Sequence, residues 1–194
     1  QNHLVEIRLF LQAIQKSGFT LGIRKCDFGK SSIRFVGHII GSGKRSVDAE
    51  KVYDAMLKLK EPETKKQLRR IIGFFSFWRD YLPSFSSIAK PLTDLTTKRV
   101  PERIPFREKE RAAFNELKRL LCEAVSKPLN IIDMSKPFYI YVDASDFAAG
   151  ACLTQPSEEG ERPVAFASCK FNQTQERWAT IHKEAYAALW ALQK

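Results

Sequence analysis

Cysteine is scarce in this sequence, and long apolar runs are missing. The 194 residues include four cysteines, which lie far apart and form no Cys-x-x-Cys pair. This distribution argues against a zinc site and against a disulfide framework. No apolar stretch approaches the roughly 18 residues that a membrane span needs, and the first residues are neither a signal nor a transit sequence. We therefore expect an intracellular protein with reduced thiols and no membrane segment.

Basic residues are plentiful, and their excess lies entirely in the first half. The net charge is +10, and residues 1–100 contain 19 Lys and Arg against 9 Asp and Glu, whereas residues 101–194 contain 13 of each kind. Such a one-sided surplus favours polyanion binding, because neutralised phosphates release their condensed counterions. The apolar fraction of 44% is enough for a globular chain of one domain or two small ones.

Periodicity and turn residues predict both helices and strands before residue 61. Apolar residues at helical spacing predict a helix over residues 3–17. Alternation predicts a strand over residues 33–39 that enters a hairpin turn at residues 41–44. Asp48 is placed to cap a helix over residues 49–60.

A longer helix is predicted next, from a capping-box pair at Thr64 and Gln67 to about Leu82. Its apolar stripe consists of Leu68, Ile71, Ile72 and Phe75. Another face carries Arg69, Gly73 and Phe77, spaced four residues apart. A glycine within a helix costs roughly 1 kcal/mol relative to alanine, so Gly73 indicates a close backbone approach. That approach could be to nucleic acid or to a neighbouring helix.

A proline-containing segment divides the chain. Residues 91–107 hold three prolines among threonines and mixed charges, which predicts a linker and a domain boundary. A helix is predicted over residues 108–124. The expected strands after it cover residues 138–144, 149–154 and 163–168. A closing helix then carries an apolar stripe of Trp178, Ile181, Ala185, Ala188, Leu189 and Leu192.

Two carboxylates are placed where ionised groups are costly unless they are paired or coordinated. Asp143 ends a strand that otherwise reads as buried, and Glu184 lies at the margin of the closing helix's stripe. Converging carboxylates of this kind can bind the divalent metal pair that supports in-line attack on a phosphodiester. Alternatively, Asp143 accepts backbone hydrogen bonds in a turn, and Glu184 pairs with Lys183 or His182.

Several motifs occur together in a fixed order. They occupy residues 21–28, 35–40, 66–83, 91–92, 142–145 with Gly150 and Gln155, 163–168 and 183–185. In this order they resemble the pol polyprotein of gypsy-class LTR retrotransposons and their retroviral relatives, over essentially the whole chain. The resemblance implies a mixed α+β or α/β fold in four parts. These parts are the end of a palm with a primer-grip-like hairpin (1–47), a helical thumb (48–90), the linker (91–107) and the N-terminal part of a ribonuclease H-like domain (108–194).

The same resemblance implies roles for individual residues. The primer grip corresponds to Phe35, Val36, Gly37 and His38, although the histidine by itself suggests no chemistry. The thumb helix would track a primer–template duplex with Arg69, Gly73 and Phe77. Asp143 and Glu184 match catalytic residues that hold Mg²⁺ or Mn²⁺ while water attacks the RNA strand of an RNA–DNA hybrid.

Missing motifs limit what this chain is expected to do. Polymerase chemistry in the family needs an Asp-Asp pair, which the sequence does not contain, and ribonuclease H chemistry needs further aspartates after Glu184. We therefore expect the parent protein to be an enzyme and this piece to be inactive. Expected partners are the RNA–DNA hybrid, the primer–template duplex and the remaining polyprotein, in a cytoplasmic virus-like particle or the nucleus. The alternative is a non-catalytic nucleic-acid-binding remnant of a decayed or host-adopted retroelement.

Overall fold

The structure, a computed structural model, describes residues 2–158 and 160–194. The chain divides into two compact units, and the division falls between Ile33 and Arg34. The first unit contains helix α1 (Asn2–Lys16) and a short 3-10 helix, η1 (Ile23–Lys25). The predicted helix over residues 3–17 is therefore confirmed. Most of its large apolar side chains are exposed, Leu4 by 74% and Leu9 by 60%. Ile7 and Ile14 are half-buried.

The second unit begins with a small antiparallel sheet. Strand β1 (Ser32–Phe35) straddles the boundary between the units, and β2 (His38–Gly41) and β3 (Lys44–Val47) form the expected hairpin. β4 (Leu129–Asn130) pairs with β3. The single strand predicted over residues 33–39 is wrong, because Val36 and Gly37 break it with φ angles of 46° and 80°.

Five helical segments follow the hairpin: α2 (Ala49–Lys58), α3 (Lys65–Phe77), η2 (Arg79–Tyr81), α4 (Phe85–Ile88) and α5 (Lys90–Asp94). The predicted capping box is confirmed at Thr64 and Gln67. α3 ends at Phe77, earlier than expected, because Trp78 leaves the helical conformation and is buried in the core. Asp48 precedes α2, but its side chain makes no capping hydrogen bond.

Residues 91–107 differ from the linker that the prolines suggest. Leu92 lies within α5 and is fully buried, and Ile104 is 7% exposed. The Ile104 amide donates to the Glu63 carbonyl at 3.0 Å, and the Lys65 amide donates to the Glu102 carbonyl, also at 3.0 Å. These apolar and backbone contacts hold the segment against the start of α3. Residues 34–194 consequently form one compact unit.

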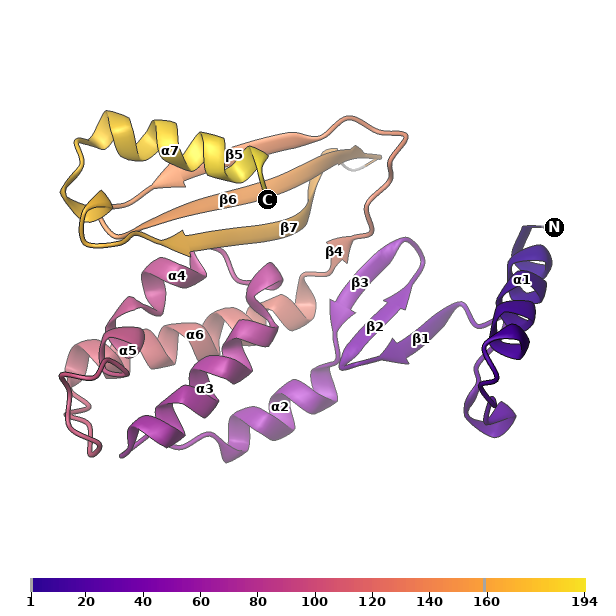
Figure 1. Cartoon of the computed structure of the whole chain (residues 1–194), viewed down its shortest axis with the longest axis horizontal. Coiled ribbons are helices and arrows are strands. Elements are labelled where there is room, and N and C mark those ends of the chain that lie inside the picture. The colour runs from indigo at the N-terminus through magenta and orange to yellow at the C-terminus, as the bar shows by residue number, and fades with distance from the viewer. Residues whose placement is uncertain (1, 159) are drawn as a thin grey trace. The chain divides into compact units, whose positions relative to one another are not determined.

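The last part of the chain is a sheet with a helix on each face. After α6 (Glu108–Ser126), the strands β5 (Tyr139–Ala144), β6 (Ala148–Ser157) and β7 (Gly160–Lys170) pair antiparallel in that order. The short η3 (Gln175–Arg177) leads into α7 (Thr180–Leu192). Figure 1 shows α7 across one face of this sheet and α4 below the other. The three strands and the closing helix predicted for this region are confirmed, and the strands are antiparallel.

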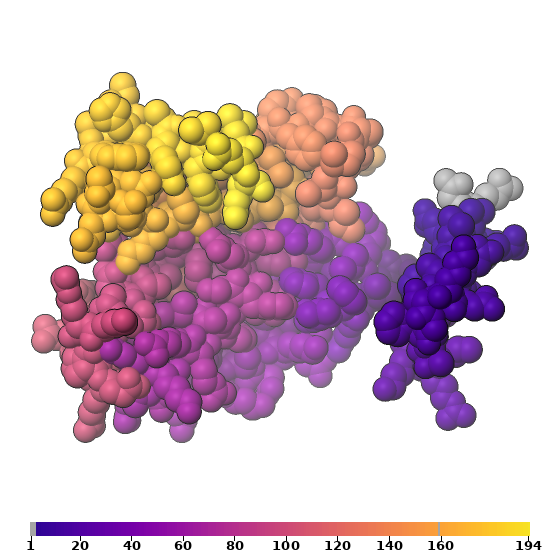
Figure 2. Space-filling model, in the orientation of Figure 1, coloured from indigo at the N-terminus to yellow at the C-terminus, as the bar shows by residue number. Residues whose placement is uncertain are grey.

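One apolar core joins the helices to both sheets. It includes Val47 of β3, Phe75 of α3 and Leu117 of α6, and Phe166 of β7 packs against it. Figure 2 shows the orange and yellow residues of the β5–α7 region resting directly on the magenta residues of the helices. A smaller core beneath α7 consists of Ala149, Phe171 and Ala187, with partly buried neighbours.

No helix among the described residues is long and apolar enough to cross a membrane.

The rotation of α7 differs from the one predicted. Ile181, Leu189 and Leu192 of the predicted stripe are 73%, 57% and 74% exposed, whereas Lys183 and Ala187 face the sheet. The ammonium group of Lys183 donates to the Asp146 carboxylate at 3.0 Å. A buried lysine satisfied in this way can occupy the inner face of a helix, and it leaves the apolar stripe outside.

Candidate nucleic-acid interface

The outer face of α3 is basic and open. Lys66, Arg69, Arg70, Gly73 and Phe77 are all exposed, and their spacing places them on one face of the helix. The opposite stripe packs inward as predicted, with Leu68 and Phe75 fully buried and Ile71 nearly so. Apolar burial therefore fixes the rotation of α3, and this rotation presents the basic residues together to solvent.

Gly73 lies at the middle of this open face. A Cβ atom built on Gly73 would meet no atom within 4 Å, apart from the backbone of its own helix. Within the described residues, no neighbouring helix uses the space that the missing side chain leaves. Of the two explanations for Gly73, close packing against another helix does not occur among the described residues of the second unit. An approach by a partner molecule remains.

The turn at Val36 and Gly37 is held against the end of α3. The Gly37 carbonyl accepts a 2.9 Å hydrogen bond from the Asp48 amide. A Cβ atom at Gly37 would lie 3.1 Å from the ring of Trp78, and its φ of 80° disfavours other residues as well. Phe35 and Val36 are 58% and 61% exposed beside it. The turn at Val36 and Gly37 therefore packs against Trp78 on its inner side and is exposed on its outer side.

His38 connects this turn to α3 and η2 through aromatic contacts. Its ring stacks on Phe77 and on Tyr81, each with a centroid distance of 5.6 Å, and meets Trp78 edge-on at 4.9 Å. Nδ1 of His38 and the Tyr81 hydroxyl share a hydrogen bond of 3.1 Å. Burial and the nearby Arg45 guanidinium lower the pKa of His38 below its ordinary 6.5. The structure thus brings two groups of sequence-predicted residues, 35–38 and Phe77, onto one surface.

Asp143 lies on an exposed edge strand, which corrects the expectation of a buried one. β5 pairs only with β6 among the described strands, and none of its side chains is buried. Val142 and Ala144 face α7, so alternation turns Asp143 to the other face of the sheet. Asp143 there borders a shallow pocket that also includes Pro83 and Ser84. Its carboxylate has no hydrogen-bond partner in the part of the chain that the structure describes.

The turn after Asp143 is closed by a different residue. The Ser145 hydroxyl accepts hydrogen bonds from the Phe147 and Ala148 amides at 3.3 and 3.1 Å. Glu184 is exposed on α7, while its neighbour Lys183 pairs with Asp146. The turn and ion-pair alternatives for the two carboxylates therefore do not occur among the described residues. Both carboxylates are unpaired, but Asp143 lies on the opposite face of the sheet from α7.

The chemistry of these carboxylates fits a divalent cation only in part. Mg²⁺ is often bound by one or two carboxylates, with water or phosphate oxygens completing its shell. Asp143 and Glu184 could supply such ligands. Within residues 2–158 and 160–194, no group of three or more His, Cys, Asp or Glu residues is placed to hold a metal ion. The pair therefore needs further oxygen ligands to form a catalytic centre.

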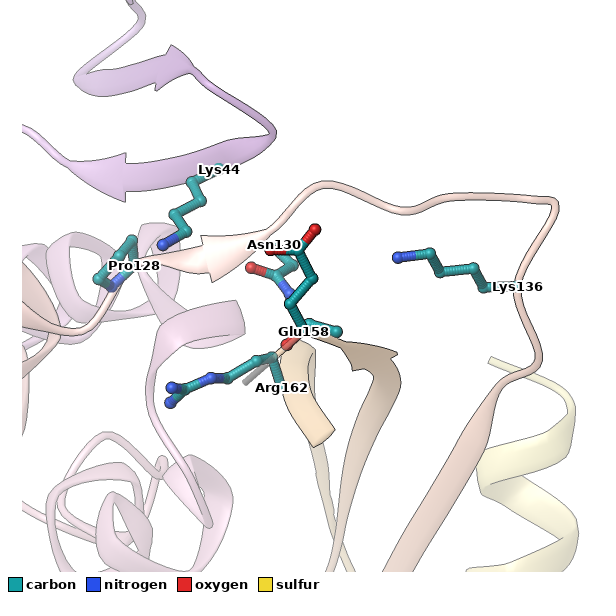
Figure 3. A pocket seen from close by; sticks show the side chains of 7 residues that line it. Lys44, Pro128, Asn130, Lys136, Glu158 and Arg162 are labelled. Carbon is teal, nitrogen blue, oxygen red and sulfur yellow. The ribbon is translucent and has the colours of Figure 1, made fainter. Parts of the chain in front are cut away.

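Sequence reasoning missed a basic pocket on another side of the molecule. Lys44, Lys136 and Arg162 line it together with Asn130 and Glu158, and its volume is about 390 Å³. Figure 3 shows the Lys136 side chain extending toward Asn130 and Glu158. These residues come from β3, β4, the segment between β4 and β5, the turn after β6, and β7, far apart along the chain. No local pattern in the sequence could have grouped them.

Known proteins similar to this chain are retroelement and retroviral polyproteins. The RNase H-like domain found in reverse transcriptase matches residues 106–194. The Pol polyprotein of the Drosophila melanogaster transposon opus is 33% identical over 98% of the chain, and that of the transposon gypsy is 31% identical over 100%. The Tf2-3 polyprotein of Schizosaccharomyces pombe is 30% identical over 98%. The chain spans only 20%, 19% and 14% of these three polyproteins.

Solved structures share the fold. The foamy viral protease-reverse transcriptase in complex with dsDNA matches 100% of the chain with a TM-score of 0.79 and 24% identity, and the chain covers 40% of it. The same kind of protein in complex with an RNA/DNA hybrid matches 98% with a TM-score of 0.75 and 23% identity, and the chain covers 25% of it. These likenesses confirm a mixed α+β fold of the foamy viral type.

Proposed function

Since this chain corresponds to the reverse-transcriptase-associated, RNase H-like region of gypsy- and Tf2-like Pol polyproteins, we propose that it is part of a retrotransposon reverse transcriptase. In this proposal residues 1–47 end the palm, residues 48–90 are the thumb, residues 91–107 are the connection and residues 108–194 begin the ribonuclease H domain. The chain contributes primer–template binding and the first two carboxylates of an RNA–DNA hybrid ribonuclease.

The observation that carries the proposal is the open, basic outer face of α3, which includes Arg69 and Gly73. Duplex nucleic acid carries phosphates along its whole length. A helix whose outer face bears exposed cations and a glycine at its middle can bring its backbone close to these phosphates. Phe77 continues this face toward His38 and the turn at residues 35–37. The thumb residues and the grip residues therefore form one surface on which a duplex end can be positioned.

The ribonuclease part of the proposal rests on the two unpaired carboxylates. In a completed site, Mg²⁺ or Mn²⁺ would activate the attacking water and stabilise charge on the phosphate. Asp143 on β5 and Glu184 on α7 are the residues that would hold that metal, and completing the site would have to bring them together, because they lie on opposite sides of the sheet in this structure. Since the described residues supply no third ligand, we expect the isolated chain to show no nucleotide incorporation and at most trace hybrid cleavage. Strong Mg²⁺-dependent cleavage that Asp143→Asn abolishes would contradict this expectation.

A second candidate is a non-catalytic nucleic-acid-binding remnant of a retroelement. The observation that favours it is the placement of Asp143 on the sheet face away from α7, the helix that carries Glu184. A protein retained only for binding needs the α3 face and no convergence of these carboxylates. The two candidates therefore share the duplex grip and differ in the ribonuclease half.

Binding of a labelled RNA–DNA hybrid across a salt series tests the shared part. We expect wild type to bind with a steep salt dependence, and we expect Arg69→Ala and Gly73→Leu to weaken binding. Gly73→Leu adds a side chain where the structure leaves open space, so the fold should tolerate it. Lys51→Ala is the matched control, because Lys51 is also exposed and lies on α2.

The results separate the proposal from general attraction between opposite charges. Weaker binding by both α3 variants, with Lys51→Ala close to wild type, supports a duplex grip on α3. Equal binding by all four proteins would show that α3 is not the contact surface. Absence of binding by wild type would contradict the thumb role for this chain.

A further inference from the structure

A groove with a volume of about 680 Å³ lies between the segment after α5 and the segment before α7. Its lining residues come from α5 and the turn that follows it on one side, and from the end of β7 and the residues that lead to η3 on the other. Four cations line this groove, and two carboxylates accompany them. These six residues are Lys90, Lys98, Arg99, Lys170, Asp94 and Glu176.

The two carboxylates of the groove hold two of its cations in place. Lys90 donates to Asp94 at 2.9 Å and lies 3.5 Å from Glu176, and Lys170 also pairs with Asp94. Burial by itself raises the pKa of Asp94, but the hydrogen bonds from Lys170 and Lys90 outweigh it and lower that pKa. Asp94 is therefore ionised at neutral pH. This network fixes the base of the groove and ties the two walls together.

The other two cations of the groove are free. Lys98 and Arg99 are exposed at its rim, and neither has an ion-pair or hydrogen-bond partner for its side chain within the described ranges. Gln173, on the opposite wall, adds an exposed amide that can donate hydrogen bonds. Unpaired cations facing an uncharged donor across an open groove form a suitable arrangement for phosphate oxygens.

The turn at the edge of this groove is hydrogen-bonded to α3. The Arg69 guanidinium donates to the Thr96 carbonyl at 3.3 Å, and the Lys65 ammonium donates to the Thr97 carbonyl at 2.7 Å. The turn that carries Lys98 and Arg99 is thus attached directly to the proposed thumb helix. A polyanion bound on α3 would therefore lie close to this turn and to its two exposed cations.

We propose that this groove binds the sugar-phosphate backbone of the duplex that α3 grips, with Lys98 and Arg99 as its phosphate contacts. The inference rests on the proposed duplex binding and extends it from the thumb toward the ribonuclease part. An extended polyanion fits better than a small anion, because the groove is open and its two free cations lie on the turn that is bonded to α3. The groove would thereby set the path by which the hybrid leaves the thumb.

The salt dependence of hybrid binding by a Lys98→Ala/Arg99→Ala variant tests this path. Each lost phosphate contact should reduce the slope of log K against log salt by about 0.9, so two contacts reduce it by about 1.8. Between 50 and 200 mM salt, wild type should then lose roughly tenfold more affinity than the variant. The matched control is Lys51→Ala/Lys60→Ala, which removes the same charge from α2 and the residues after it.

Three results are possible. A shallower slope for Lys98→Ala/Arg99→Ala, with the control close to wild type, supports the groove as part of the duplex path. Equal slopes for the groove variant and the control overturn it, and weakening by Arg69→Ala in the same assay would then leave the α3 grip standing. Absence of hybrid binding by wild type overturns the proposed function and the groove together.

Discussion

Replacing Gly73 by alanine should separate the stability of this chain from its binding of nucleic acid. Alanine is favoured over glycine within a helix by about 0.8–1 kcal/mol. Gly73 lies inside α3, and a Cβ atom there would meet nothing within 4 Å outside its own helix backbone. We therefore expect Gly73→Ala to be more stable than wild type by nearly this amount. For a chain of this size, that gain corresponds to a rise in Tm of about 2–4 °C.

The same methyl group should weaken hybrid binding if a duplex approaches the backbone of α3 at this point. Crowding a close-packed contact costs about 1–3 kcal/mol, which is roughly 5- to 150-fold in Kd. Thermal melting and fluorescence anisotropy on the same two proteins measure both effects. A less stable Gly73→Ala variant would show that an intramolecular contact needs the glycine. A more stable variant with unchanged hybrid affinity would refute the close approach.

Three other predictions concern the residues around this face. Tyr81→Phe removes the hydrogen bond to His38 and should cost about 0.5–1.5 kcal/mol, measurable by urea denaturation. Burial and the Arg45 guanidinium lower the pKa of His38 in the folded protein, so the His38 imidazole binds a proton more readily in the unfolded chain. The folded state should therefore lose stability as the pH drops below 6.5. Melting from pH 7 to pH 5 should show this loss, and His38→Gln should reduce it; equal loss in both proteins would exclude His38 as its source. Amide exchange should be faster in β5 and α7 than in α3, since the core beneath α7 is small, and equal protection would contradict this.

Much of α3 could be predicted because its signals are local. Thr64 and Gln67 fix where the helix starts through hydrogen bonds to nearby backbone, and the spacing of Leu68 and Phe75 fixes which face is buried. The antiparallel strands of the last sheet were also predictable from alternation and turn residues. The roles of Asp143, Glu184 and the grip residues stay predictions, since they depend on ligands that bind these positions.

Features set by distant residues could not be predicted in the same way. The break at Val36 and Gly37 is fixed by packing against Trp78, some forty residues later in the chain. The rotation of α7 depends on a buried Lys183, and its partner Asp146 lies in the turn between β5 and β6. Periodicity counts lysine as an outward-facing residue, so it placed the apolar stripe of α7 inside.

Lysine acetylation with and without bound RNA–DNA hybrid tests the central claim, duplex binding on α3, most directly. Lys66 lies on the outer face of α3, while Lys51 is exposed on α2 and serves as the internal reference. Mass spectrometry at saturating hybrid should find Lys66 protected and Lys51 as reactive as in the free protein. If Lys66 remains fully reactive while the hybrid is bound, the duplex lies elsewhere on the molecule and the claim is wrong.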